Sequence, residues 1–391
     1  MMKRSLAAAV AIATISAGSA QAAEDFKVGV SGFLNAGFLA QDVDNDRNEY
    51  DVTSVRTDNV IAMTGQTVLD NGLKVSVVAG FSLDQNQSQN NIYQEEIYIQ
   101  AGGAFGDVRL GRGRNAGAVL HAFIPSAGVG TYAVDDARTN AFIGGISQVT
   151  TATSLGEAEY ANRITYFTPR IEGIQLAASF TPETDPSADL SFGSFSNNTN
   201  NNTSYNANRF GGQFATIQNE YSLAANFARE FDGVGVVGSF GYTAGDAPAS
   251  STTVARDMEA IHAGGNISYA GFTVGAAWGY YEDPNVTATN GTSDAGTHAW
   301  GAGARYETGP WGFGASFLHK ESTNGNAAFD ADGDGLAVNE ATYYEAGMTY
   351  TLGSGVTTGA GVYYNDNAEA AGSNGEPEDS LAGVVNLSVA F

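Results

Sequence analysis

The chain has 391 residues, no cysteine and a formal net charge of −25, from 17 basic and 42 acidic side chains. This acidic balance argues against a nucleic-acid partner, which requires a basic surface, and the lack of cysteine excludes a disulfide framework and thiolate chemistry. Fifty glycines, with 18 tyrosines and 21 phenylalanines, favour a fold made of many strands and turns.

The first 22 residues are expected to be a signal peptide. Lys3 and Arg4 form a positive n-region, residues 6–15 are apolar, and Ala20-Gln21-Ala22 matches a cleavage site. The apolar stretch is too short to cross roughly 30 Å of hydrocarbon, which disfavours a membrane anchor. The expected mature chain, residues 23–391, carries a charge of −27, because losing Lys3 and Arg4 leaves 15 basic and 42 acidic residues.

The mature chain alternates apolar and polar residues with a period of two, the pattern of β-strands. In the first predicted strand, 26–38, Phe26, Val28 and Val30 share one face and Lys27 lies on the other. The last predicted strand, 381–391, ends on Phe391, which is similar to the assembly signal of outer-membrane barrels. The other predicted strands are 55–69, 73–83, 92–101, 105–112, 160–168, 174–181, 220–230, 234–243, 259–269, 272–281, 297–306, 311–320, 341–351 and 356–365.

The connections between these sixteen predicted strands alternate between short turns and long loops. An even strand count with short turns on one rim and long loops on the other is typical of outer-membrane barrels. No stretch after residue 22 is apolar for 18 residues, so the sequence predicts no transmembrane helix. The fold class expected is all-β: a 16-stranded antiparallel transmembrane β-barrel, wide enough for a water-filled lumen.

Two motifs carry a resemblance to a known family. The run Phe105-Gly106-Asp107-Val108-Arg109-Leu110-Gly111-Arg112 resembles the segment before the third loop of Gram-negative general diffusion porins. The stretch 162–169, with Gly173 beyond it, resembles a hairpin of the same porins, although Arg163 and Thr168 depart from the usual residues. As a whole, the sequence most resembles the acidic porins of purple and related Gram-negative bacteria.

This resemblance implies a homotrimer in which the long third loop, here residues 112–157, folds into each barrel and narrows it. Acidic groups on such a loop face basic groups on the wall. The residues expected at the constriction are therefore Asp135 and Asp136 on the loop, facing Arg56, Arg112, Arg114 and Arg163. The alternation of residues predicts a lumenal side chain for Arg56 and Arg163, because charge on the lipid face is costly. An alternative is that these arginines only pair with neighbours such as Glu159.

An enzymatic function fits the sequence less well, and no catalytic residue is expected. The glycine pattern at 233–238 begins a predicted strand without a following helix, so it fails the context of a dinucleotide site. None of the four histidines has a partner at metal-binding helical spacing. A serine–histidine pair using His262 or His298 is left open by the sequence.

An acidic loop at 330–335 could bind calcium. Asp330, Asp332 and Asp334 alternate with small residues, as carboxylate ligands do in calcium loops. The pattern lacks the final glutamate spacing of a helix-loop-helix site, so a simpler loop site and a solvated acidic turn remain the two interpretations. No cofactor is required.

The expected function is passive diffusion of small hydrophilic solutes and ions through a porin in the outer membrane of a Gram-negative bacterium, with a preference for cations. Alternatives are a porin specific for sugars or anions, and a plugged adhesion or structural barrel. The chain would be a multi-pass membrane protein. Expected partners are two further copies of the chain, outer-membrane lipid and lipopolysaccharide, and the barrel-assembly machinery that reads Phe391.

Overall fold

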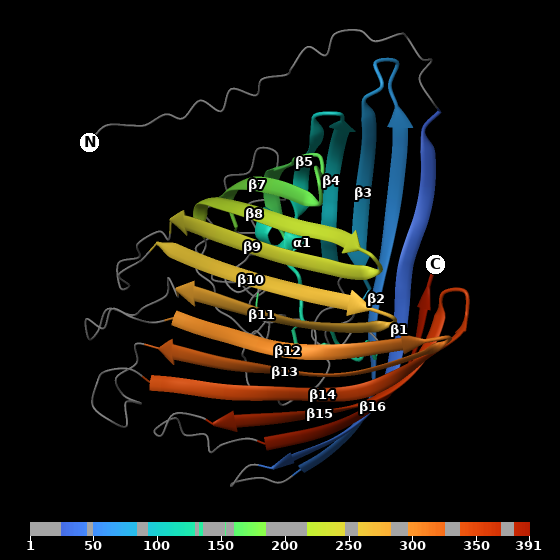
Figure 1. The fold of residues 1–391 in the computed structure, drawn as a ribbon, viewed down its shortest axis with the longest axis vertical. Helices are drawn as coiled ribbons and strands as arrows, with labels where there is room; N and C mark the ends of the chain where they lie inside the picture. Colours follow the sequence, from blue (N-terminus) through green and yellow to red (C-terminus); the bar gives the residue numbers. More distant parts are fainter. Residues whose placement is uncertain are drawn as a thin grey trace.

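The chain folds into a closed barrel of sixteen antiparallel strands (Figure 1). The computed structural model describes residues 25–44, 50–83, 93–129, 133–135, 153, 160–184, 217–246, 257–282, 296–324, 337–368 and 379–391. Each strand pairs with its neighbours in sequence, and β1 (Lys27–Asp44) also pairs with β16 (Asp379–Ala390) from Phe33↔Ala390 to Asp44↔Asp379. This closure leaves no free sheet edge, which confirms the predicted fold class.

The strands follow the predicted order from residue 27 to residue 390. Between β1 and β16 lie β2 (Tyr50–Val68), β3 (Lys74–Ser82), β4 (Tyr93–Gly103), β5 (Gly106–Gly113), β6 (Ala161–Phe167), β7 (Ile174–Glu183), β8 (Gln218–Phe231), β9 (Val234–Asp246), β10 (Met258–Tyr269), β11 (Phe272–Glu282), β12 (Gly296–Thr308), β13 (Trp311–Asn324), β14 (Ala337–Gly353) and β15 (Val356–Ala368).

Several strands extend beyond the predicted bounds at the ends that carry long connections. β2 begins at Tyr50 rather than at residue 55, and β14 begins at Ala337 rather than at residue 341. These extensions include polar residues such as Asp51, Asn339 and Glu340, so hydrophobic alternation alone left them outside the predicted strands. Sheet pairing continues there because the backbone bonds of the ladder do not depend on an apolar side chain.

The two faces of the barrel differ in side-chain size and polarity. On β8, Tyr221 and Leu223 are exposed on the outer face, whereas Ser222 and Ala224 between them are buried on the inner face. The same alternation runs through β16, where Leu381 is exposed and its neighbour Ala382 is buried. Large apolar side chains on the outside and small or polar ones on the inside fit a barrel surrounded by lipid.

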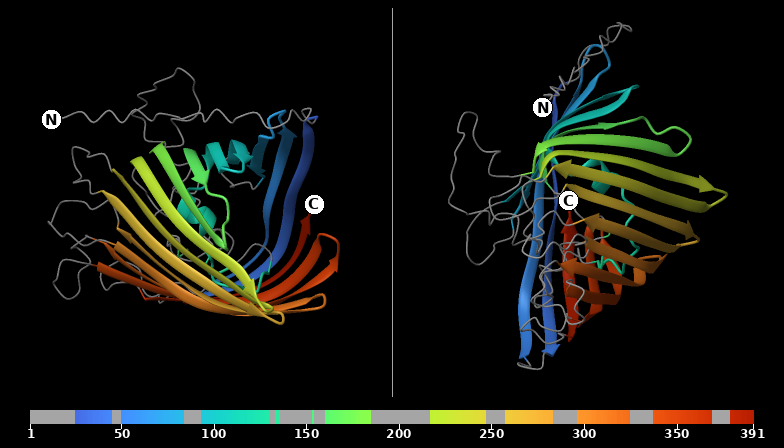
Figure 2. Two further views of the ribbon diagram at one scale, coloured as in Figure 1. Left: turned by 45° about the horizontal axis from the view of Figure 1, so that its top comes forward. Right: turned by 90° about the vertical axis from the view of Figure 1, so that its left-hand side faces the viewer.

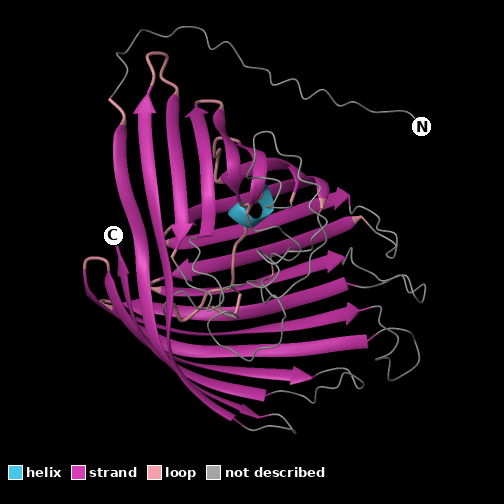
Figure 3. Ribbon diagram, turned by 180° about the vertical axis from the view of Figure 1, so that it is seen from behind, coloured by secondary structure: helices cyan, strands magenta, loops and turns pink. Residues whose placement is uncertain are grey.

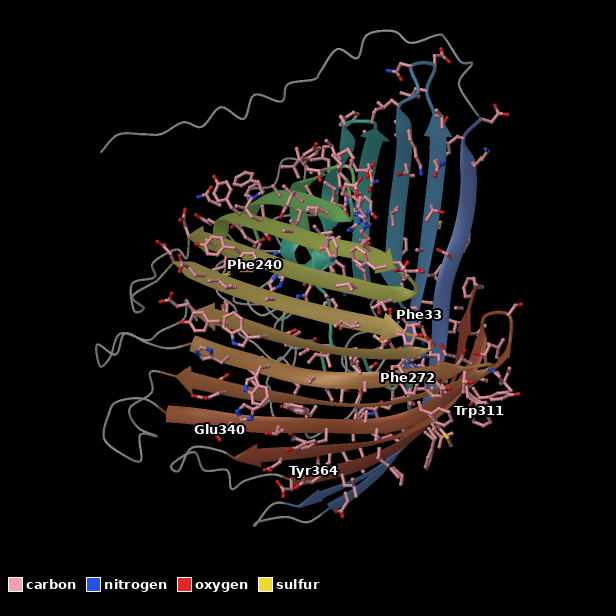
Figure 4. All side chains as sticks on the ribbon, viewed as in Figure 1. Phe33, Phe240, Phe272, Trp311, Glu340 and Tyr364 are labelled. Carbon is pink, nitrogen blue, oxygen red and sulfur yellow. The ribbon has the colours of Figure 1, made fainter. Side chains whose placement is uncertain are left out.

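Aromatic side chains gather on the outer face near both rims. Phe272 stacks on Tyr306 with ring centroids 4.1 Å apart, and Trp311 meets Tyr350 at 4.6 Å, both pairs close to short turns. Tyr364 lies toward the opposite rim, as does Glu340 (Figure 4). Aromatic belts at two levels are typical of the two membrane interfaces, so the outer face defines a transmembrane band.

Among the described residues there is one short helix, α1 (Ala116–Leu120), which follows β5 and lies within the barrel (Figures 2 and 3). The sequence did not predict it, because five residues are too few for a helical period to be recognised. Within the described ranges, no helix is long and apolar enough to cross a membrane. Because α1 directly follows β5, it belongs to the third long connection, which enters the barrel.

A charged residue on the outer band should destabilise the barrel. We expect Leu223→Lys on β8, which places a charge among lipid-facing side chains, to lower the free energy of unfolding by about 2–4 kcal/mol. Ala228→Lys, on the inner row of the same strand, is the control and should cost much less. Urea unfolding in lipid vesicles measures both, and equal losses would contradict the assignment of the two faces.

Candidate functional site

The third long connection begins against the inner wall of the barrel. We call its described residues 115–129 the inner segment. The Asn115 side chain accepts a hydrogen bond from the first turn of α1 at 2.9 Å. The amides of Ala116 and Gly117 donate to the hydroxyl oxygens of Ser179 on β7 (3.1 Å) and Ser222 on β8 (3.0 Å). Because the first amides of a helix lack partners within it, these serines fix α1 to the wall.

Beyond α1 the inner segment is extended and is bonded to polar side chains of the next strands. Ser239 on β9 accepts a hydrogen bond from the amide of Ala122 at 2.8 Å. Asn266 on β10 donates to the carbonyl oxygen of Phe123 at 3.1 Å. The segment belongs to no sheet, so side chains of the wall supply the partners that its backbone needs when water is excluded.

Glu345 on β14 fixes the far end of the inner segment. Its Oε1 accepts from the amide of Ala127 (3.0 Å) and the hydroxyl of Ser316 (2.7 Å), and its Oε2 accepts from the amide of Val134 (3.2 Å). Arg305 on β12 donates to the carbonyl oxygen of Ala127 at 3.0 Å. One buried carboxylate therefore joins positions 127 and 134 of the loop and holds both against the wall.

Glycines of the wall make room for the loop backbone. Three of them lie under it: Gly264 beneath Ala122, Gly279 beneath Thr153 and Gly303 beneath Pro125. A Cβ atom added at any of these positions would collide with the backbone carbonyl oxygen of the loop residue above it. The inner face thus carries a track in which the absence of side chains permits close backbone approach.

Apolar side chains of the loop fill hollows between strands at two places. Val129 is fully buried and packs with Leu39 on β1 and Tyr363 on β15. Ile124 and Val134 join a second cluster formed by residues of β10 to β14. The described part of the loop therefore lies along the wall from β7 to β15, held by apolar contacts as well as by hydrogen bonds.

Two histidines, a threonine and an aspartate form a buried chain of polar contacts. The Nδ1 atoms of His262 on β10 and His121 on the loop are 2.9 Å apart, and Nε2 of His121 is 2.7 Å from Oγ1 of Thr153. Thr153 donates its hydroxyl to Oδ2 of Asp135 at 2.9 Å. Burial, and then the nearby His262, lower the pKa of His121 to about 3, so His121 is neutral at physiological pH.

Asp135 and Arg163, two residues expected at the constriction, are both buried. Asp135 accepts hydrogen bonds from the amides of Ile124 (3.1 Å) and Thr153 (2.6 Å), so its carboxylate joins three parts of the loop. Arg163 has the predicted inner parity on β6 and forms an ion pair with Glu220 on β8, with 3.5 Å between Nη1 and Oε1. Asp136 lies outside the described residues.

The other three expected arginines are partly exposed. Arg56 lies on the inner row of β2, in register with Gly37. Arg114 approaches Tyr160, with 3.5 Å between Nη2 and the phenol oxygen. By register Arg112 shares the parity of Leu110, which is exposed on the outer face. The role of all six residues in a constriction stays a prediction.

The described residues contain no group of three or more His, Asp or Glu side chains that could hold a metal ion. Asp330, Asp332 and Asp334 lie outside the described residues, so the calcium hypothesis stays a prediction. Sequence patterns gave no signal for the contacts that seat the loop. His121 and His262 are 141 positions apart, and Ala127 and Glu345 are 218 apart, and neither separation follows from a local motif.

The fold and the loop together define a class of protein. A closed barrel with an apolar outer band, a polar inner face and an internal third connection is the architecture of an outer-membrane channel. The model of the Gram-negative porin family matches residues 7–370. The chain therefore belongs to the Gram-negative porin family, and the resemblance noted in the sequence is confirmed.

Solved structures with the same fold have diverged far in sequence. The anion-selective porin from Comamonas acidovorans superposes with a TM-score of 0.63 at 14% identity, over 94% of this chain and 100% of that one. The outer-membrane channel DcaP of Acinetobacter baumannii gives 0.63 at 12%, over 96% and 100%. The trimer form of OmpT from Vibrio cholerae gives 0.58 at 10%, over 94% and 100%. No curated protein sequence matches the chain significantly.

Filling the glycine track should displace the loop. We expect Gly264→Ala to lower the free energy of unfolding by about 1–3 kcal/mol, because the added methyl group meets the Ala122 carbonyl. Gly238→Ala is the matched control, since no atom lies within 4 Å of its added Cβ. Thermal unfolding of both variants in detergent checks the difference; a Gly264→Ala protein as stable as the control would show that the loop does not occupy this track.

Breaking the buried ion pair should cost more than removing a partly exposed arginine. Arg163→Ala leaves the buried carboxylate of Glu220 without its cation, so we expect a loss of about 3–5 kcal/mol in stability. Arg56→Ala on the inner row of β2 should cost less than about 1 kcal/mol. The two variants are compared by urea unfolding in vesicles, and similar losses would argue against a structural role for the Arg163–Glu220 pair.

Proposed function

We propose that the protein forms a water-filled channel through which small hydrophilic solutes and ions diffuse passively across the outer membrane. Membership of the porin family supports a channel rather than an enzyme. Barrels of 16–18 strands leave an aqueous lumen, and this barrel has sixteen. The main support for the proposal is the position of the inner segment. It is hydrogen-bonded to the wall from β7 to β14 and so narrows the barrel from one side.

The proposed channel prefers cations. The chain carries 42 acidic against 17 basic residues, and an excess of negative charge raises the local concentration of cations. Two inner-row arginines contribute little positive charge to this balance, because Arg163 pairs with Glu220 and Arg305 pairs with Glu307 at 3.0 Å. The Comamonas acidovorans structure is described as anion-selective. The fold alone therefore does not determine ion selectivity, which we attribute to the charged residues of each chain.

Specificity for sugars is the less favoured function. A sugar channel would present a track of exposed aromatic rings to the lumen. On the inner rows of the described strands, Tyr281, Tyr343 and Tyr363 are instead buried in the clusters that hold the loop. These three rings are packed against the loop, so they offer little exposed aromatic surface to a sugar.

The proposed assembly is a homotrimer in the outer membrane. The Vibrio cholerae OmpT structure of the same fold is described as a trimer form. The exposed apolar band would contact membrane lipid and, on the outer leaflet, lipopolysaccharide. Phe391 is exposed and its backbone bonds to Gly32 of β1 at 3.0 and 3.1 Å; its proposed recognition by the barrel-assembly machinery is consistent with a position at the seam where the barrel closes.

Reversal potentials in a KCl gradient test the function and its selectivity together. Reconstituted protein should conduct and prefer potassium over chloride, and Arg56→Ala should increase that preference by removing a lumenal cation. Arg229→Ala is the control, because Arg229 pairs with Glu172 near a short turn and should leave the reversal potential unchanged. A clear chloride preference would contradict the proposed selectivity, whereas protein without any conductance would contradict the channel itself.

A further inference from the structure

We propose that Glu96, which a β-bulge places on the lumenal face of β4, is the residue that sets the preference of the channel for cations. This role rests on the proposed channel function and deepens it. It puts the deciding negative charge on the wall of the barrel, whereas the sequence suggested aspartates of the third loop. Glu96 was not among the residues expected at the constriction.

The bulge lies where β4 runs beside β3. The two strands pair regularly as far as Ala79, and beyond it β4 holds one residue more than β3 before the pairing resumes. Glu95 and Glu96 therefore stand together opposite the single residue Gly80. A bulge interrupts the alternation of side chains between the two faces of a sheet. Two consecutive glutamates can thus share one face, which a regular strand does not allow.

The neighbouring residues of β5 show which face Glu96 occupies. Tyr98, two residues further along β4, pairs with Gly111, whose partner on the other side is Arg163 of inner parity. A Cβ atom added at Gly113, the next residue of that inner row, would lie 3.6 Å from the Tyr98 ring and 3.9 Å from Oε1 of Glu96. Both side chains therefore lie on the inner face, where Glu96 is partly exposed.

Glu96 lies at the height where the third connection leaves the wall. Gly113 is the last residue of β5, and Asn115, two residues further on, caps α1. The inner segment begins at this point and narrows the barrel along β7 to β14. A fixed charge acts most strongly on ions where their path is narrow and the surrounding walls exclude water. The carboxylate of Glu96 is therefore well placed to select passing ions.

Other described carboxylates inside the barrel are less suited to this role. Five of them are buried and cannot contact a hydrated ion in the lumen: Asp58, Glu95, Asp135, Glu220 and Glu345. Asp107 and Glu307 are more exposed but lie within two residues of short turns, and Glu183 is the last residue of β7. Within the described strands this leaves Glu96 as the partly exposed carboxylate at the height of the loop root.

The closest arginine on the inner row of β5 is held by other groups. Nε of Arg109 donates to Oε1 of Gln100 at 3.2 Å, and its guanidinium carbon lies 4.3 Å from the ring centroid of Tyr98 and 5.0 Å from that of Phe167. Glu96 forms no ion pair with any described residue. Its charge is therefore available to the lumen, and its removal would leave Arg109 to make this part of the wall more positive.

Reversal potentials in a KCl gradient across a planar bilayer test the role of Glu96. Glu96→Gln keeps the size of the side chain and removes its charge, so the ratio of potassium to chloride permeability should fall by about half or more. Glu96→Asp retains the charge and should retain most of the preference. Glu259→Gln is the matched control, because Glu259 is exposed on the outer row of β10, where it accepts from Tyr242 at 2.8 Å, and should leave the ratio unchanged.

The salt concentration of the recordings separates an effect of charge from an effect of pore width. The screening length falls from about 30 Å at about 0.01 M salt to about 3 Å at about 1 M. The difference between the wild type and Glu96→Gln should therefore be large in dilute KCl and small in concentrated KCl.

Three results would count against the role of Glu96, and they are distinguishable. A Glu96→Gln ratio equal to that of the wild type, or a difference that does not depend on salt, would overturn the role while leaving a cation-preferring channel intact. Chloride preference in the wild type would overturn the proposed selectivity and this role with it. Protein that does not conduct would instead overturn the proposed function itself.

Discussion

Every backbone polar group that lies in the membrane must find a partner inside the protein, and the structure is built around this requirement. The sheet meets it by closing β1 on β16, so that no strand leaves an unpaired edge. The inner segment is the exception, because it crosses the barrel interior without joining the sheet. Its amides and carbonyls are matched instead by side chains of the wall, chiefly serine hydroxyls, the Asn266 amide, the Arg305 guanidinium and the Glu345 carboxylate.

The need to bond the inner segment explains the amino-acid composition of the inner rows of the wall. A wall that only faced water would tolerate any polar residue there. A wall that holds a loop against its surface needs short hydrogen-bonding side chains within reach of the loop backbone, and it needs space where that backbone comes closest. Serine and asparagine supply the hydrogen bonds, and glycines such as Gly264 and Gly303 leave the space. These wall glycines therefore allow close approach of the loop backbone and do not form turns.

The sequence predicted the barrel well and the site poorly, for one physical reason. Strand alternation is local, so sixteen strands could be recognised from residues two apart, and what was missed lay at strand ends, such as those of β1, β2, β13 and β14. The loop contacts are not local, and parity alone could place Arg163 on the inner face without revealing that Glu220 meets it there. In the same way, the position of Asp135 near the middle of a long loop suggested an exposed charge, whereas its carboxylate bonds to Thr153 and Ile124.

The anchors of the inner segment are spread along its length rather than gathered at its ends. Serine hydroxyls bond to the amides of Ala116, Gly117 and Ala122, and the Asn266 amide bonds to the carbonyl oxygen of Phe123. Further along, Glu345 and Arg305 bond to the backbone of Ala127. Because these partners come from several strands between β7 and β14, the loss of any one side-chain bond leaves the others to hold the segment against the wall.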